Sequence, residues 1–286
     1  MWWRRWIWRS LLPLALGPIV AWGSAEGQAL KFGFTPVLSE AEMRAEFEPL
    51  MAYLSEAIGQ KVELYIAKNY GDLRTQMEAG AVDIGSFSPF AYVDAMQGGK
   101  IRIIAQSILD GSATYRGLIV TRQDSGIKTV ADLKGKRFAF VDPKSASGYV
   151  YPRAMLMEQG VTPESYFGEI FFAGGHDKVV AAVLEGRADA GAIYDGALAV
   201  EKARGKPTES LVTVVSTDPI PHDAIAVRLG MEEALAARIQ RALVDLDKSE
   251  SGRTVIAKSK KKLTGHVLAE DSRFDVVRRT AKLAGM

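Results

Sequence analysis

A short loop rich in hydroxyl groups lies near the middle of the chain and has the residue types that bind anions. It contains Ser145, Ala146, Ser147 and Gly148, and it follows an apolar run at 137–141. The pattern predicts a strand, a loop and a helix N-terminus, which direct free backbone N–H groups and the positive end of a helix dipole at one place. The hydroxyls add donors, and glycine lets a ligand approach the backbone. The loop is therefore a candidate anion site, and an ordinary serine helix cap is the alternative.

This loop belongs to a regular alternation of predicted strands and helices, which is typical of an α/β fold. Apolar runs predict strands at 30–34, 62–67, 82–86, 101–108, 137–141, 169–172, 189–194, 211–216 and 224–228. Apolar residues at helical spacing predict helices between them, most clearly over 41–57, and the segment 232–286 is predicted to be helical. A cluster of lysines in the middle of this C-terminal segment is interpreted as a solvated face: Lys258, Lys260, Lys261 and Lys262.

A short motif occurs twice. The stretches 80–85 and 186–191 both have the spacing Gly-x-x-Asp-x-Gly, each after a predicted helix and at a predicted strand. Two related α/β halves would explain the repetition, and coincidence is the alternative because only three residues are fixed. If the halves are related, a ligand is expected between them, at strand carboxyl ends and helix N-termini.

The N-terminus has the pattern of a secretory leader. A basic, Trp-rich stretch at 1–9 precedes an apolar run at 11–22 and small residues at 23–29. Cleavage is expected after Ala29, with Ala25 as second choice; an uncleaved anchor and a twin-arginine signal at Arg4-Arg5 are the alternatives. Either way the body of the protein is expected outside the cytoplasm, in the periplasm. No later stretch is long and apolar enough to span a membrane.

Composition narrows the function classes. The 286 residues, 48% of them hydrophobic, suffice for one large or two medium domains. Without the leader the chain carries 33 basic and 33 acidic residues, which argues against a broad nucleic-acid surface. The sequence contains no cysteine, which excludes disulfides, thiolate metal sites, a cysteine nucleophile and a lipid-modified N-terminal cysteine.

Four stretches together resemble the phosphonate, phosphite and phosphate-binding proteins of ABC importers: 129–136, 140–148, 174–177 and 186–191. The resemblance implies a type II-like periplasmic binding protein, with two α/β lobes joined by two crossover strands and a ligand cleft between them. Residues 30–117 and 224–286 would form one lobe and 118–223 the other, after a signal peptide at 1–29. It also implies a monomer without cofactor or catalysis, whose partner is an inner-membrane permease.

The resemblance also suggests site residues. Ser145 and Ser147 match two serines that hold the oxyanion, whereas Ala146 stands where the family has threonine, so one hydroxyl donor is lost. His176 matches the family's site histidine, and a helix cap is its alternative. The remaining residues carried over by the resemblance are Tyr70 and Tyr115 as phenol donors, Asp195 and Asp223 as acidic groups opposite the oxyanion, and Tyr194 as a residue that closes the pocket.

Ordinary structural roles stay open for these last residues. Tyr70 and Tyr115 could be aromatics at a core edge, Asp195 could cap a helix at 196–203, and Asp223 could belong to a turn. Ser86, Ser88 and a helix N-terminus at Pro89 could border the same cleft, and a structural cap is the favoured interpretation. His222 and His266 are interpreted as surface residues.

An acidic group in an anion pocket must face either a P–OH proton or a substrate ammonium group, because it would repel a bare dianion. The sequence leaves open whether the ligand is a protonated oxyanion or an aminoalkylphosphonate. Two other function classes are the alternatives: a secreted oxyanion sensor that partners a membrane histidine kinase, and a hydrolase. Ser145, His176 and Asp195 are residue types of a catalytic triad, but the sequence has no Gly-x-Ser-x-Gly elbow and no metal motif.

Overall fold

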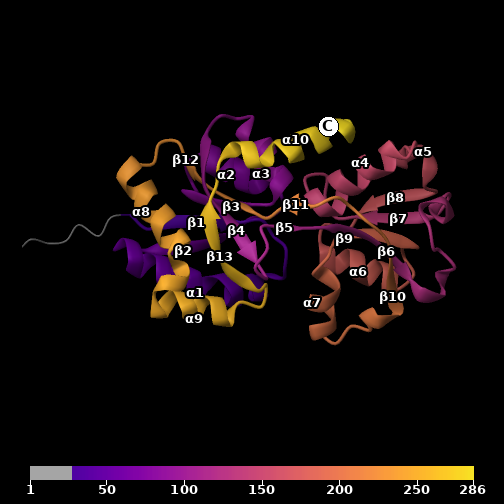
Figure 1. Ribbon diagram of the computed structural model, residues 1–286, viewed down its shortest axis with the longest axis horizontal. Coiled ribbons are helices and arrows are strands. Elements are labelled where there is room, and N and C mark those ends of the chain that lie inside the picture. The colour runs from indigo at the N-terminus through magenta and orange to yellow at the C-terminus, as the bar shows by residue number, and fades with distance from the viewer. Residues whose placement is uncertain (1–27) are drawn as a thin grey trace, which may run out of the picture.

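The computed structural model describes residues 28–286, so the expected leader at 1–29 lies almost entirely outside the described residues. Figure 1 shows two sheets side by side, each covered by helices on both faces, which is the layered arrangement of an α/β protein. The predicted fold class is therefore confirmed.

The strands and helices of the described chain follow each other in alternation. The strands are β1 Leu30–Phe34, β2 Val62–Ile66, β3 Ile84–Phe87, β4 Ile101–Leu109, β5 Thr114–Tyr115, β6 Gly117–Arg122, β7 Arg137–Phe140, β8 Glu169–Phe172, β9 Ala190–Tyr194, β10 Leu211–Ser216, β11 Ile220–Pro221, β12 Ala224–Arg228 and β13 Leu263–Leu268. The α-helices are α1 Glu40–Ile58, α2 Asp72–Glu78, α3 Pro89–Met96, α4 Tyr151–Glu158, α5 Pro163–Tyr166, α6 His176–Leu184, α7 Ala197–Ala203, α8 Glu233–Val244, α9 Glu250–Lys258 and α10 Asp275–Leu283. A π-helical turn at Ala146–Val150 precedes α4.

Two sheets and a short ribbon organise these strands. The first sheet has the order β13-β4-β12-β3-β1-β2, and the second has the order β10-β6-β9-β7-β8. β5 pairs with β11 in a separate antiparallel ribbon that lies between the two sheets (Figure 1). The first sheet therefore draws strands from both ends of the described chain, and the second draws them from the middle. The division into lobes at 117 and 224 stays a proposal.

The prediction for the C-terminal segment was wrong in one respect. Helices α8, α9 and α10 form as predicted, but β13 lies between α9 and α10 and pairs antiparallel with β4. The segment 263–268 is short, and its alternation is interrupted by Gly265, whose φ of 153° is accessible mainly to glycine. Its hydrogen-bonding partner lies more than 150 residues away, and a local pattern cannot show such a pairing.

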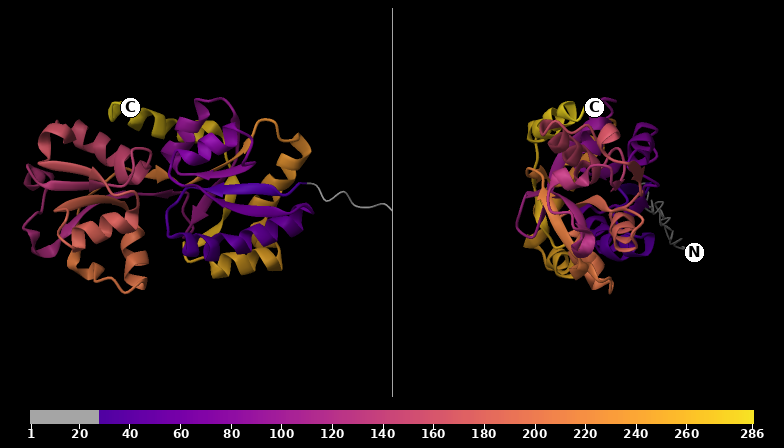
Figure 2. Two further views of the ribbon diagram at one scale, coloured as in Figure 1. Left: turned by 180° about the vertical axis from the view of Figure 1, so that it is seen from behind. Right: turned by 90° about the vertical axis from the view of Figure 1, so that its right-hand side faces the viewer.

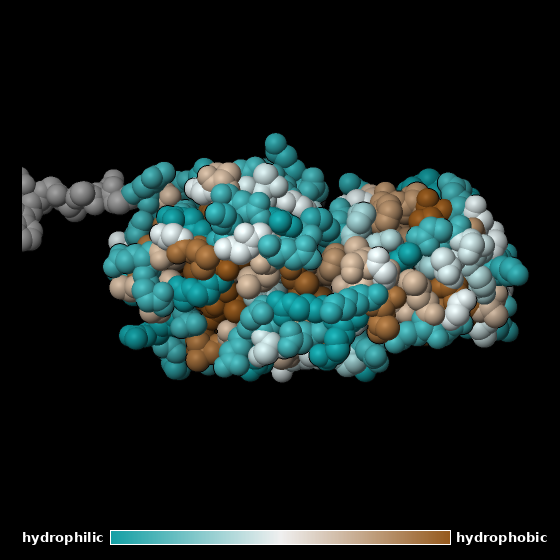
Figure 3. All heavy atoms as spheres, turned by 90° about the horizontal axis from the view of Figure 1, so that it is seen from above, coloured by the Kyte–Doolittle hydropathy of each residue, from teal (hydrophilic) through white to brown (hydrophobic). Residues whose placement is uncertain are grey.

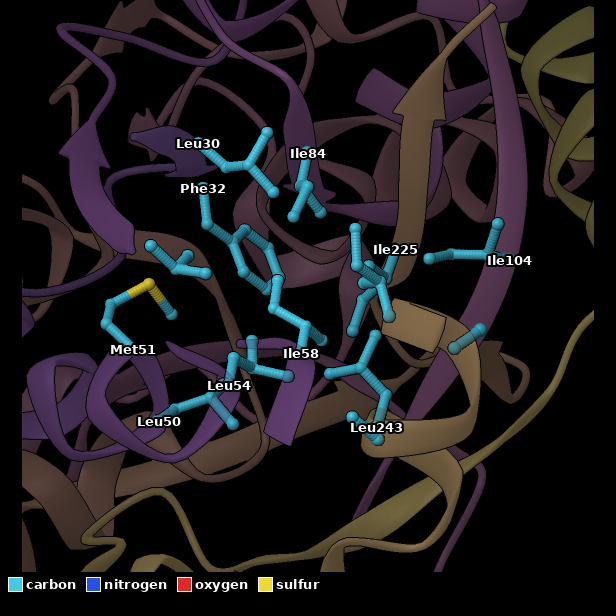
Figure 4. Packing of buried hydrophobic residues seen from close by; sticks show 14 of the residues in the cluster. Leu30, Phe32, Leu50, Met51, Leu54, Ile58, Ile84, Ile104, Ile225 and Leu243 are labelled. Carbon is cyan, nitrogen blue, oxygen red and sulfur yellow. The ribbon is translucent and has the colours of Figure 1, made fainter. Parts of the chain in front are cut away.

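The larger apolar core lies between the first sheet and the helices α1 and α8. Phe32 of β1 and Ile84 of β3 point toward Leu54 of α1, and Leu243 of α8 lies beside them (Figure 4). These four side chains are fully buried. Burial of a side chain of this size contributes about 1.5–3 kcal/mol to stability, so this face of the sheet is a rigid support for the loops at the strand ends.

The repeated Gly-x-x-Asp-x-Gly motif has the same structural role in both sheets. Asp83 accepts a hydrogen bond from the backbone N–H of Lys31 on β1 at 2.9 Å and pairs with Arg228 at 2.8 Å. Asp189 accepts from the backbone N–H of Arg137 on β7 at 2.9 Å and pairs with the Arg137 guanidinium at 2.8 Å. Each aspartate thus fixes the start of a parallel strand, which supports two related halves.

The C-terminal helix joins the two parts of the molecule. α10 runs along the top of the first sheet's helices and reaches α4 beside the second sheet, as the views from both sides show (Figure 2). Val277 and Ala281 of α10 share an apolar cluster with Tyr151 of α4. Arg153 of α4 donates to the carbonyl of Ala284 at 2.8 Å. These contacts connect the helices of the first sheet with α4 beside the second sheet.

The face seen from above is mostly hydrophilic, with apolar residues set between hydrophilic ridges (Figure 3). Within residues 28–286, no helix has both the length and the apolar character needed to cross a membrane.

Candidate functional site

A cavity of about 60 Å³ lies where the carboxyl ends of strands from both sheets meet. Its walls come from loops after β1, β2, β3, β7 and β8, from the ends of β4 and β9, and from the β5–β11 ribbon. The lining residues are Val37, Tyr70, Ser88, Leu109, Tyr115, Ser145, Ser147, His176, Tyr194, His222, Asp223 and Lys261. Seven of the nine residues predicted from sequence are in this set. Strand carboxyl ends between two α/β units are the usual place for a ligand.

The serine loop combines the two roles that the sequence left open. Ser145 accepts a hydrogen bond from the backbone N–H of Gly148 at 3.1 Å and so caps the π-helical turn. Its side chain also lines the cavity, beside that of Ser147. Gly148 is required here, because a Cβ would lie 2.4 Å from Val141. The tight turn brings both hydroxyls to the cavity wall.

His176 is held as a neutral hydrogen-bond donor. The backbone N–H of Tyr194 donates to its Nδ1 at 3.2 Å, so Nδ1 is an acceptor and the ring proton resides on Nε2. Burial, together with the Lys261 ammonium, lowers the pKa of His176 to about 3. The imidazole therefore stays neutral at physiological pH. The Tyr194 ring meets it edge to face at 4.9 Å and fixes its orientation.

Three tyrosines line the cavity with their phenols protonated. Burial raises the pKa of Tyr70 and Tyr115 well above the usual value, and contacts with Ser145 and Ser147 respectively oppose this rise. Burial also raises the pKa of Tyr194 to about 12. Each phenol can therefore donate a hydrogen bond without adding negative charge.

Asp223 is the acidic group of the cavity. Burial raises the pKa of its carboxyl group, while the Lys261 ammonium lowers it. A carboxyl group in this state can share one proton with a bound oxyanion. His222, its neighbour, stacks on Tyr115 with ring centroids 4.9 Å apart and an interplanar angle of 15°. Burial and Lys261 lower the pKa of His222 to about 4.

The interpretation of both remaining histidines as surface residues was wrong. His222 lines the cavity because the β5–β11 ribbon turns it inward, where its backbone N–H donates to Ala113 at 2.9 Å. His266 is a buried residue of β13, with Nδ1 3.3 Å from the carbonyl of Leu243. Neither placement could follow from the sequence, since β11 and β13 are recognised only through their pairing.

Besides His222, two further polar residues of the cavity come from outside the predicted set, as do the apolar Val37 and Leu109. Ser88 occupies the N-cap position of α3, yet its side chain makes no cap hydrogen bond. Its buried Oγ has no hydrogen-bond partner among the described residues, which marks a donor available to a ligand. Lys261 was interpreted as part of a solvated face, but its side chain is half-buried and lines the cavity.

The structure does not bring Ala146 or Asp195 to the cavity. Ala146 is 1% exposed, and its side chain packs in the apolar cluster that contains α3 and α10. Asp195 is exposed; its carboxylate accepts from the backbone N–H of Arg116 at 2.9 Å, and its own N–H donates to the Arg116 carbonyl at 3.0 Å. Asp195 thus ties the residue between β5 and β6 to the end of β9, and it is not among the residues that line the cavity.

A larger hollow of about 460 Å³ lies at the opposite end of the first sheet, beside Gln28 and Asp83. One of its two carboxylates, Asp83, is already paired with Arg228 and with a backbone N–H. It lacks the convergent hydroxyls and imidazoles of the smaller cavity. No group of histidine, aspartate and glutamate side chains suited to a metal ion occurs within residues 28–286.

Comparison with known proteins agrees with this geometry. Residues 32–274 match the family described as the periplasmic substrate-binding protein of phosphonate ABC transporters. The chain is 34% identical over 218 residues to the phosphate-import protein PhnD of Mycolicibacterium smegmatis, covering 71% of this chain and 68% of that protein. It is 25% identical over 252 residues to the phosphonates-binding periplasmic protein of Escherichia coli, covering 85% and 74%. The tetrathionate sensor histidine kinase TtrS of Salmonella typhimurium is 26% identical over 253 residues, which cover 82% of this chain but 42% of TtrS.

Solved structures show the same fold. A binding protein component of an ABC phosphonate transporter from Pseudomonas aeruginosa superposes with a TM-score of 0.83 and 20% identity, covering 90% of this chain and 86% of that one. The expected two-lobed architecture of periplasmic binding proteins is therefore confirmed.

Proposed function

The chain belongs to the family of periplasmic substrate-binding proteins of phosphonate ABC transporters, and from this premise we propose that the 60 Å³ cavity holds a small phosphorus oxyanion: phosphate, phosphite or a short alkylphosphonate. Asp223 is its proposed acceptor, and its proposed donors are Tyr70, Ser88, Tyr115, Ser145, Ser147, His176 and Tyr194. Ala146 and Asp195, which the family resemblance included, are proposed to act through packing and backbone contacts.

One observation carries this proposal. Neutral donors converge on the cavity from both sheets, together with one carboxyl group, Asp223, and one ammonium group, Lys261. Such donors solvate an oxyanion without a full countercharge. The carboxyl group requires one proton between itself and the ligand. A phosphorus oxyanion with a P–OH group brings that proton, whereas sulfate does not.

We propose that binding closes the two lobes, 30–117 with 224–286 against 118–223. A bidentate ion pair joins them: Arg204, after α7, contacts Glu42 of α1, with one of the two hydrogen bonds at 2.7 Å. Lys144 of the serine loop pairs with Asp94 of α3 at 2.5 Å. A ligand that touches both lobes would favour this closed form.

The protein would act by binding rather than catalysis, as a monomer in the periplasm, and would deliver its ligand to an inner-membrane permease. The partial similarity to a tetrathionate sensor kinase supports a second candidate, a sensor that shares the binding lobes. Neighbouring genes for an ATPase and a permease would favour transport, and a histidine kinase gene would favour sensing.

A thermal-shift screen tests the proposed ligand class. The purified protein is heated with phosphate, phosphite, methylphosphonate or sulfate, and a ligand that binds only the folded state raises the melting temperature. We expect a rise with at least one phosphorus oxyanion, and loss of that rise in His176→Ala. No rise with any of the three would contradict the proposal.

A further inference from the structure

Lys261 differs from the lysines around it. Lys258, Lys260 and Lys262 are exposed, whereas the Lys261 side chain is half-buried and reaches the cavity that contains His222 and Asp223. Its ammonium group perturbs three of the ionisable groups there, since it lowers the pKa of His176, His222 and Asp223. It comes from the connection between α9 and β13, far in sequence from the serine loop. It therefore supplies a cation to one wall of the proposed site.

A buried carboxylate holds the turn that carries Lys261. Glu46 of α1 is 8% exposed and accepts hydrogen bonds from the backbone N–H groups of Lys260 at 2.9 Å and Lys261 at 3.2 Å. It also accepts from the hydroxyl of Ser259, whose oxygen in turn accepts from the N–H of Leu263 at 3.0 Å. Because Glu46 is occupied by these donors, the turn is fixed on the body of the first lobe.

The next residue adds a second constraint. Lys262 has φ +59° and Asp110 has φ +50°, and they are the non-glycine residues with positive φ in the described chain. They contact each other twice: the Asp110 N–H donates to the Lys262 carbonyl at 2.8 Å, and Lys262 Nζ lies 2.8 Å from the Asp110 carboxylate. Left-handed conformations of this kind cost free energy and persist where the surroundings impose them. The direction of Lys261 is thus imposed by the structure on both sides of it.

The Lys261 ammonium is left available to a ligand. Within residues 28–286 it makes no ion pair shorter than 4 Å, and it lies 6.0 Å from the centroid of the Phe47 ring. An aromatic face at this distance stabilises a cation only modestly. Because both nearby imidazoles are neutral, Lys261 is the positive side chain of the cavity lining.

We propose that Lys261 is a specificity-determining residue that selects phosphorus oxyanions without a cationic group of their own. This inference rests on the proposed function and names the ligand class of that same site. An aminoalkylphosphonate would have to place its ammonium group in a cavity of about 60 Å³ that already holds the Lys261 ammonium. A space of that size holds only a few water molecules, so the two cations could not lie far apart. The acidic group at Asp223 is then left to share a proton with the oxyanion.

Isothermal titration with two isosteric ligands tests this selection. Ethylphosphonate and aminomethylphosphonate differ mainly in a methyl group that is replaced by an ammonium group. We expect the wild type to bind ethylphosphonate at least about tenfold more tightly than aminomethylphosphonate. Where a ligand binds too weakly for direct titration, its affinity is measured by competition against the best oxyanion. Lys261→Gln should reduce this ratio to about threefold or less. It should also lower the affinity for the best oxyanion about tenfold, as loss of a charged hydrogen bond does.

Two further variants make the result specific. Lys260→Gln removes an exposed charge from the same turn and should leave both quantities unchanged. Lys261→Arg keeps the charge and should retain the preference. Melting temperatures of the ligand-free variants identify any that fail to fold.

Equal wild-type affinity for the two isosteres would overturn the inference. It would also be overturned if Lys261→Gln bound the best oxyanion with an affinity within twofold of that of Lys260→Gln. If the wild type binds no phosphorus oxyanion at all, the proposed function fails and the inference falls with it, which is a different result from either of these.

Discussion

The backbone N–H of Tyr194 donates a hydrogen bond to Nδ1 of His176 at 3.2 Å. This contact decides the chemistry of the imidazole, because it assigns the proton to Nε2 and leaves that N–H as the free donor. His176 begins α6, and Tyr194 ends β9 of the second sheet, against which α6 packs. The fold thus prepares a neutral donor before any ligand arrives.

The buried histidines should make stability depend on pH. Burial lowers the pKa of His176 to about 3 and of His222 and His266 to about 4, while unfolded histidine titrates near 6.5. Between pH 4 and 6.5 the unfolded chain therefore binds more protons, and stability rises with pH. We expect the free energy of unfolding to increase by about 1.4 kcal/mol per pH unit for each such histidine, offset in part by the raised pKa of Asp223.

Urea denaturation of the ligand-free protein at pH 5 and pH 7 measures this dependence. Of the three histidines, His266 lies outside the cavity. His266→Phe should therefore lower the slope of the free energy of unfolding against pH without altering the site. A free energy of unfolding that stays flat or falls with rising pH would show that the imidazoles are protonated in the folded state.

Removal of single hydroxyls should weaken binding without unfolding the protein. Ser88 and Ser147 face the cavity from different sheets, and the Oγ of Ser88 has no partner among the described residues. Each alanine variant should bind the best oxyanion about tenfold more weakly, since a hydrogen bond to a charged ligand is lost. Calorimetric titration gives the affinities, with Ser55→Ala as a control, because that hydroxyl bonds to the Met51 carbonyl on α1. Unchanged affinity in both cavity variants would remove these serines from the site.

Restoring the family threonine should not restore a donor. Ala146 is 1% exposed and packs in an apolar cluster, so a larger polar side chain there is crowded rather than directed at the cavity. Ala146→Thr should lower the free energy of unfolding by about 1–3 kcal/mol and should not increase the affinity for oxyanions. A tighter complex with normal stability would mean that this side chain reaches the ligand.

The ion pair between Arg204 and Glu42 should prolong the bound state. It joins α1 to the end of α7, with one hydrogen bond at 2.7 Å. In the proposed closure of the two lobes this contact stabilises the closed form, so its loss should favour opening. Glu42→Gln should raise the ligand dissociation rate a few-fold, roughly 1 kcal/mol, with a smaller effect on the association rate. Stopped-flow kinetics measures both rates. Glu40→Gln is the matched control, because Glu40 pairs with Arg44 on the exposed face of the same helix; equal effects of both variants would contradict the closure role.

The sequence revealed those parts of the site that lie in local patterns. β1 was predicted with its observed bounds, and the serine loop was recognised because an apolar run, small residues and a helix follow each other within twenty residues. The resemblance to a known family then led to Tyr70, His176 and Asp223, which the fold places at one cavity.

Other parts depend on contacts between distant segments. Lys261 stands in a run of lysines that has the composition of a solvated surface, and only the contact of its turn with Glu46 directs it inward. His222 is turned inward by the β5–β11 ribbon, whose strands are two residues long. Asp195 has the residue type of a ligand group, but the Arg116 backbone occupies it. Local periodicity cannot show such pairings.

Isothermal titration of the purified wild-type protein with phosphate, phosphite, methylphosphonate and sulfate tests the central claim most directly. The account predicts one site that binds at least one phosphorus oxyanion, and sulfate binding that is at least about a hundredfold weaker at pH 7.5, because sulfate brings no proton to share with Asp223. Sulfate bound as tightly as the best phosphorus ligand, or no heat with any of the four, would contradict it.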